Sequence, residues 1–114
     1  MSAQEPGAAL PFSHAYGKLN RSVFPTIRRR DKFGSVGDLV SVTLGERGNR
    51  ENVGVAEIIG KESERWDALS DRFVTYDTDT ENREGATKTI NSFYRHPISD
   101  DEHLTIYWCK WVSQ

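Results

Sequence analysis

The stretch that decides the fold is Phe24-Pro-Thr-Ile-Arg-Arg-Arg-Asp-Lys32, followed after three intervening residues by Val36-Gly-Asp-Leu-Val-Ser-Val42. The first part predicts a short strand over 23–28, and the second predicts a strand over 39–44 in which apolar residues alternate with Ser and Thr. Because proline donates no ladder hydrogen bond, Pro25 predicts that the first strand lies at a sheet edge. The cations that end this strand predict a pocket or groove for an anionic group.

Further elements are predicted on both sides of this stretch from hydrophobic period and turn residues. They are a short helix over 13–19, a polar connection over 45–52, a strand over 53–61, a helix beginning after Ser63, a helix over 78–95 with a capping box at Thr78 and Glu81, and a buried strand over 104–111. Together they predict an α+β fold: a small β-barrel of about five to six mostly antiparallel strands, with two or three short helices packed on it.

Length and charge restrict the organisation of the chain. Its 114 residues suit one domain over 12–114, preceded by a flexible arm over 1–11 that is built from small residues and two prolines. The formal net charge is −2, but residues 18–32 carry six cations against Asp31 alone, a local charge of +5. Residues 62–84 carry eight carboxylates against three arginines, a local charge of −5. A nucleic-acid partner would therefore bind a local patch and not a generally basic surface.

Cysteine, histidine and hydropathy point away from several classes of protein. Cys109 is the only cysteine, so no internal disulfide can form and we expect a cytoplasmic setting. No apolar run approaches the roughly 20 residues that span a bilayer, and the N-terminus has no apolar leader, so we expect no membrane association. The histidines lack ligand spacing, so we predict no metal site and no cofactor.

Four short motifs, in this chain order, resemble those of the ASCH domain family, a branch of the PUA-like small β-barrels. Thr26-Ile-Arg28 resembles the family's Thr-x-Arg strand, and Gly37-Asp38 with the strand that follows resembles its Gly-Asp strand. Glu81-Asn-Arg-Glu-Gly85 resembles its Glu-Gly helix start, and Leu104-Thr-Ile-Tyr-Trp108 resembles its closing strand. The resemblance covers roughly residues 12 to 112, and no single motif in it is long.

The resemblance implies a cleft between barrel and helices, used in various members for RNA or nucleotide binding. Some bacterial members of the family use this cleft to remove the acetyl group from acetylcytidine. Those enzymes place a Lys three residues before the Thr, where this chain has Val23, and Gly17-Lys18 lies further upstream and would reach the cleft only after a loop rearrangement. A Thr hydroxyl needs a base, and Arg28 stays protonated, so this departure favours a protein that is not an enzyme. If it is an enzyme, Thr26 and Glu84 are the candidate catalytic residues.

The candidate ligand-binding residues come from three parts of the chain: Thr26, Arg28, Arg30 and Lys32 from the basic strand end, Glu84 and Tyr94 from the last predicted helix, and Trp111 from the final strand. Each also has a structural interpretation. Strand alternation would put Arg28 and Arg30 on one face, but the cations could equally form a solvated edge. Glu84 could simply pair with Lys88 four residues later, and most of the aromatic residues fit a core.

Three functional hypotheses follow from these observations. The leading one is a module without enzymatic activity that binds RNA or a nucleotide in a basic cleft. The second is an amidohydrolase acting on a modified nucleoside such as acetylcytidine. The third is a structural component of a viral or multi-subunit assembly, with residues 1–11 and the basic edge as protein contacts.

Overall fold

The structure is a computed structural model that describes residues 7–46 and 48–114. Its elements, in chain order, are β1 (Ala8–Phe12), the 3-10 helix η1 (Gly17–Asn20), β2 (Val23–Arg28), β3 (Leu39–Glu46), β4 (Asn49–Arg65), the 3-10 helix η2 (Trp66–Ala68), α1 (Asp71–Thr78), α2 (Arg83–Asn91) and β5 (His103–Ser113). The predicted α+β class is therefore confirmed.

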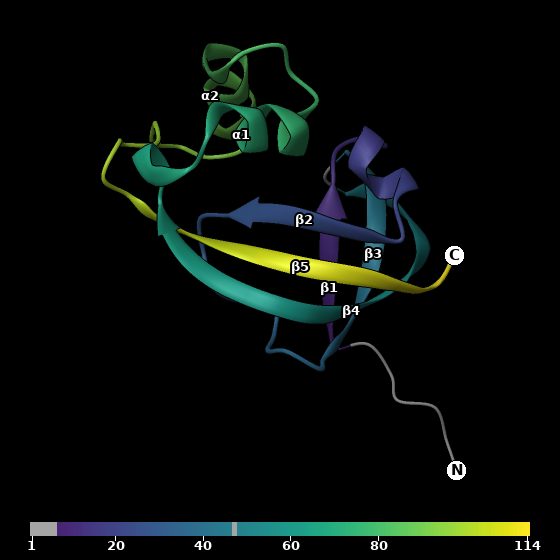
Figure 1. Ribbon diagram of the computed structural model, residues 1–114. Helices are drawn as coiled ribbons and strands as arrows, with labels where there is room; N and C mark the ends of the chain where they lie inside the picture. The colour runs from purple at the N-terminus through teal and green to yellow at the C-terminus, as the bar shows by residue number, and fades with distance from the viewer. Residues whose placement is uncertain (1–6, 47) are drawn as a thin grey trace.

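The strands form one strongly curved sheet, with α1 and α2 lying together on the side of β2 (Figure 1). The strand order is β1-β3-β4-β5-β2. β1 is parallel to β3, and the other neighbours are antiparallel, as predicted for most of the sheet. Within the described residues β1 and β2 are the two edges and do not pair with each other, so the sheet is not closed and the predicted barrel is not confirmed.

The strand predictions reflect local sequence patterns that the structure satisfies. β2 has the predicted bounds and lies at an edge, which accommodates the missing amide hydrogen of Pro25. In β3 the side chains of Val40 and Val42 are buried, as expected from their alternation with polar residues. The long β4 pairs first with β3 and then with β5, so it connects the two halves of the sheet.

A register shift where β3 meets β4 explains one glycine. Val42 pairs with Gly54, whereas Thr43 pairs with Asn52, so Val53 is an extra residue in β4. Gly54 has φ 158°, and a Cβ there would approach the carbonyl oxygen of Ser113 to 2.3 Å. Only glycine fits this crossing, because any side chain would clash with the backbone of β5.

Two predicted irregular segments are wrong in part. Residues 8–11 were expected in a flexible arm, but they belong to β1, whose Leu10 is fully buried; residues 1–6 of that arm lie outside the described part. The predicted connection over 45–52 is mostly strand, since β3 continues to Glu46 and β4 starts at Asn49, with position 47 outside the described residues.

The helix bounds differ from the prediction because several polar residues compete as caps. The helix predicted after Ser63 splits into η2 and α1, and the N-cap of α1 is Ser70. Thr78 is the last residue of α1 and not a cap of the next helix; the N-cap of α2 is Asn82, whose side chain accepts a hydrogen bond from the Gly85 amide. The short helix predicted over 13–19 is the 3-10 turn η1.

Apolar side chains gather in two clusters. One fills the concave side of the sheet and contains Leu10, Phe12, Phe24, Val40 and Tyr107, among others. The other packs α1 and α2 against β2 and β5, and includes Ile27, Trp66, Val74 and Ile106. A cavity lies where the two clusters meet, since residues of both line it. In the part of the chain that the structure describes, no helix has the length and apolar character to cross a membrane.

Candidate nucleotide-binding site

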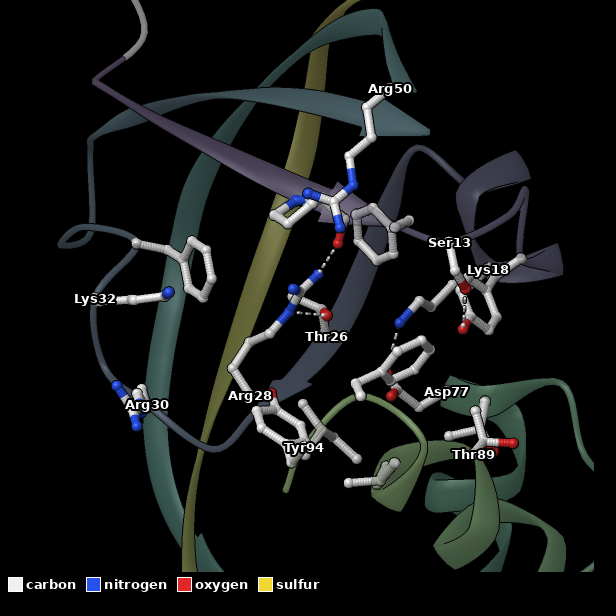
Figure 2. A pocket seen from close by; sticks show the side chains of 18 residues that line it. Ser13, Lys18, Thr26, Arg28, Arg30, Lys32, Arg50, Asp77, Thr89 and Tyr94 are labelled. Carbon is white, nitrogen blue, oxygen red and sulfur yellow. Dashed lines mark hydrogen bonds and ion pairs between the residues drawn. The ribbon is translucent and has the colours of Figure 1, made fainter. Parts of the chain in front are cut away.

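The cavity has a volume of about 320 Å³ and opens to solvent between β1, β2 and the two α-helices. Figure 2 shows its polar side chains converging from segments that are far apart in sequence. The aromatic rings on its wall are those of Phe12, Tyr16, Phe33, Phe93 and Tyr94. A concave, largely apolar site with a few convergent polar groups is the usual form of a small-molecule pocket.

Thr26 and Arg28 lie on one face of β2, two residues apart, and both line the cavity. The Arg28 Nε donates to Thr26 Oγ1 at 3.0 Å, and Nη2 donates to the carbonyl oxygen of Pro11 in β1 at 2.8 Å. The guanidinium carbon lies 4.9 Å from the ring centroid of Phe12 and 5.0 Å from that of Phe33. Arg28 is thus held in one orientation by two strands and two rings.

Arg28 is a partly buried cation without a carboxylate partner among the described residues. None of the ion pairs within residues 7–46 and 48–114 includes it. Burial lowers the pKa of Arg28, but an arginine side chain remains protonated in proteins. Its positive charge is therefore available to an anion or a carbonyl group that enters the cavity.

A buried ion pair forms another part of the lining. Lys18 Nζ in η1 lies 2.7 Å from Asp77 Oδ1 in α1, and the two side chains are only 2% and 6% exposed. The Lys18 amine also lies 5.1 Å from the ring centroid of Phe12 and 5.3 Å from that of Tyr16. Burial lowers the pKa of Lys18, and the negative charge of Asp77 opposes this shift.

The segments that carry this ion pair are fixed by a second contact. The Gly17 amide donates to Asp79 Oδ2 at 2.7 Å, next to Lys18 in η1 and just after α1. Asp79 has the left-handed φ of 55° and is the C-cap of α1. The two contacts hold Lys18 and Asp77 together at the cavity wall.

Three exposed cations lie at the mouth of the cavity: Arg30 and Lys32, which follow β2, and Arg50, near the start of β4. None of them forms an ion pair within the described residues. The segment with Arg30 and Lys32 is anchored at Tyr107, whose hydroxyl donates to Asp31 Oδ1 at 2.8 Å and accepts from the Phe33 amide at 3.2 Å.

The structure brings together five of the seven predicted ligand-binding residues: Thr26, Arg28, Arg30, Lys32 and Tyr94 all line the cavity. Arg29 points elsewhere, as strand alternation predicts, and its Nε lies 2.6 Å from Glu102 Oε2. The Tyr94 side chain lines the cavity and also contacts Arg29, whose guanidinium carbon lies 4.9 Å from the Tyr94 ring centroid.

Glu84 and Trp111 do not line the cavity, which corrects their predicted placement. Glu84 is 78% exposed on α2 and pairs with Lys88 at 3.5 Å, the alternative that helical spacing offered. Trp111 packs on Phe24, with ring centroids 5.2 Å apart, and its indole nitrogen donates to the carbonyl oxygen of Leu19. Trp111 is therefore partly buried and packs against the core cluster on the concave side of the sheet.

Asp77 and Arg50 were not predicted from the sequence to line the cavity. Lys18 was predicted to lie outside the cleft unless a loop rearranged. Lys18 reaches the cavity because η1 lies beside α1, a contact between residues 59 positions apart. Asp77 had a usable signal: it follows Phe73 by four positions and Val74 by three, so it occupies the apolar face of its helix. A carboxylate on such a face predicts a buried partner.

No group of three or more His, Cys, Asp or Glu side chains is arranged to hold a metal ion within residues 7–46 and 48–114. Comparison of the chain with models of protein families, with curated proteins and with solved structures finds no match.

Proposed function

We propose that this protein binds a nucleotide, free or within an RNA strand, in the cavity beside β2, and that binding is its activity. The observation that carries the proposal is the partly buried guanidinium of Arg28, which has no carboxylate partner among the described residues and lines the cavity together with the three cations of the mouth. Such an arrangement suits a ligand with a polar ring and a phosphate.

Size and charge support this ligand class. A volume of about 320 Å³ falls at the lower end of the range for small-molecule pockets, which suits one nucleotide. Five cationic side chains and one carboxylate line the cavity, a local charge of +4 in a chain of net charge −2. The aromatic wall offers faces on which a base can stack.

The curved sheet also supports membership of the ASCH family, as an open relative of the PUA-like barrel. β2 carries Thr26 and Arg28 of the motif, and the strand after Gly37-Asp38 is β3. In this proposal the site residues of the motif are Thr26 and Arg28 only, because Glu84 lies outside the cavity.

Calorimetric titration with nucleoside monophosphates, and anisotropy with a labelled single-stranded RNA, would test the proposal at low salt. We expect Arg28→Gln to weaken binding at least tenfold, because it removes the charge and the two-pronged donor. Glu84→Gln is the matched control, since it changes one charge outside the cavity and should leave affinity unchanged. Absence of binding by the wild type, or equal affinities of the wild type and Arg28→Gln, would contradict the proposal.

A second candidate is the amidohydrolase, favoured by one observation: Lys18 lines the same cavity as Thr26, and burial lowers the pKa of its amine. A lysine with a lowered pKa is the kind of base that a Thr nucleophile requires. Purified wild type would release acetate and cytidine from acetylcytidine, and Thr26→Ala would abolish release. No product from the wild type, with nucleotide binding intact, would remove this candidate.

A further inference from the structure

The buried pair of Lys18 and Asp77 has hydrogen-bonding capacity that the protein leaves unused. The ammonium carries three donors, and its hydrogen bond to Asp77 Oδ1 uses one of them. Asp77 Oδ2 accepts no hydrogen bond from the described residues. Among the described residues Thr43 Oγ1 is the single solvent-inaccessible side-chain nitrogen or oxygen without a hydrogen-bond partner, so the unpartnered Asp77 Oδ2 is still accessible. Because Asp77 lines the cavity, this access is to the cavity.

Stability alone is a weak reason for such a pair. Removing two charges from water costs several kcal/mol per ion, and apolar residues of the same size often serve stability as well or better. Here the pair is held in place by the Gly17–Asp79 contact and faces an open volume of about 320 Å³. The pair is therefore preorganised to act as a donor and an acceptor side by side.

The two ends of the cavity, the Lys18–Asp77 pair and the mouth, differ in net charge and therefore in how they interact with a phosphate. At the pair, the positive charge of Lys18 is offset by Asp77, whose carboxylate would repel a phosphate. At the mouth, Arg30, Lys32 and Arg50 have no carboxylate partner among residues 7–46 and 48–114. A phosphate is thus favoured at the mouth and disfavoured at the pair.

We propose that Lys18 and Asp77 recognise the polar edge of a nucleobase, with the phosphate directed outward to Arg30, Lys32 and Arg50. The Lys18 ammonium donates to a ring nitrogen or carbonyl oxygen of the base, and the free oxygen of Asp77 accepts from an adjacent amino or imino group. This inference rests on the proposed nucleotide binding and adds the orientation of the ligand and the residues that select it.

The test compares three probes that carry different parts of a nucleotide: nucleosides, nucleoside monophosphates and ribose 5-phosphate. Calorimetric titration at low salt would measure each probe against the wild type and Asp77→Asn, an isosteric change that removes the acceptor charge. We expect Asp77→Asn to lower the affinity for nucleosides and for nucleoside monophosphates by the same factor, at least fivefold. Ribose 5-phosphate should bind weakly to both proteins and show no loss in the variant.

The double variant Arg30→Ala/Lys32→Ala tests the other end of the ligand. This variant should lower the affinity for nucleoside monophosphates at least tenfold and leave the affinity for nucleosides unchanged, because only the phosphate reaches these cations. Lys88→Ala, which removes an exposed lysine on α2 outside the cavity, is the control and should change neither probe. Melting temperatures of all variants verify that the comparison is between folded proteins.

Two results would overturn the inference while the proposed function stands. One is that Asp77→Asn raises the affinity for nucleoside monophosphates and leaves the affinity for nucleosides unchanged, which would place the phosphate beside the Asp77 carboxylate. The other is that the mouth variant weakens nucleosides as much as nucleotides. If the wild type binds none of the probes, the proposed function itself fails, and the inference fails with it. If Asp77→Asn does not fold, the double variant Lys18→Met/Asp77→Leu replaces the pair with apolar side chains of similar size and decides the same comparison.

Discussion

Cys109 is the clearest case of a single residue whose chemistry is set by its surroundings. It lies on β5, fully buried in the cluster on the concave side of the sheet. Burial raises the pKa of its thiol from an ordinary value of 9.0 to about 11, and the positive charges of Arg28 and Lys18 oppose the shift only in part. The thiol therefore stays protonated and unreactive in the folded protein at neutral pH.

This shift makes a prediction about stability at alkaline pH. Because the folded pKa is raised, the contribution of Cys109 is fully present below pH 9 and is lost as pH rises toward about 11. Relative to Cys109→Ala, the wild type should lose about 2 to 3 kcal/mol of unfolding free energy across that window. Guanidinium denaturation of both proteins at pH 8, 9.5 and 11 would measure the difference, and a constant difference would contradict the prediction.

Residue-scale reasoning succeeded where a local pattern dictates the side-chain direction. Alternation predicted that Arg28 and Arg30 share a face and that Arg29 leaves it if the strand continued. β2 ends at Arg28, yet the predicted sides hold, with Arg28 and Arg30 at the cavity and Arg29 beside Glu102. It did not predict the contact of Lys18 with Asp77. No local pattern encodes a contact over 59 positions, which depends on how η1 packs beside α1.

At the scale of elements, the helix starts show how cap competition limits prediction. Thr78 with Glu81 fits a capping box, yet Thr78 Oγ1 donates to the carbonyl oxygen of Val74 and so completes α1. Asn82 caps α2 because its side chain accepts from the Gly85 amide at 2.8 Å. The sequence pattern predicted only Thr78 as the cap, and it missed Asn82 because both residue types favour this position.

The cap assignment predicts the outcome of two substitutions. Asn82→Ala should destabilise the protein by about 1 kcal/mol, because the Gly85 amide loses its partner, whereas Asn82→Asp should retain most of the stability. Urea denaturation followed by circular dichroism would measure both changes. Equal losses from the two variants would show that the side-chain oxygen of Asn82 does not act as a cap.

β1 went unpredicted because Ala8-Ala-Leu-Pro-Phe12 has weak strand propensity, and it is a strand through parallel pairing with β3. Leu10 is 1% exposed in the core, which a flexible arm would not explain. Leu10→Ala should therefore cost about 3 kcal/mol of unfolding free energy, and Ala9→Ser, at an exposed neighbouring position, less than about 0.5. If thermal or urea denaturation showed similarly small losses of unfolding free energy for both variants, residues 8–11 would behave as the flexible arm that the sequence predicted.

At the scale of the whole molecule, the contrast between the basic and acidic segments is reduced by pairing within the fold. Arg29 of the basic segment is neutralised by Glu102, and Asp77 of the acidic segment by Lys18. Asp67 and Asp71 pair with Arg65 and Arg83 of their own segment. What remains uncompensated on the basic side is concentrated at the cavity and its mouth, so attraction of a polyanion should be local and short-ranged.

This distribution predicts how binding of single-stranded RNA depends on salt. Each phosphate neutralised by a protein cation releases counterions, so log K falls linearly with log salt, by about 0.7 per contact for a single strand. Lys32→Ala should reduce this slope by about that amount, whereas Lys88→Ala, on the surface of α2, should not change it. Anisotropy titrations from about 25 to 200 mM salt would give both slopes. Equal reductions would mean that RNA is attracted by cations spread over the surface, and the cavity mouth would then have no special part in binding the phosphates.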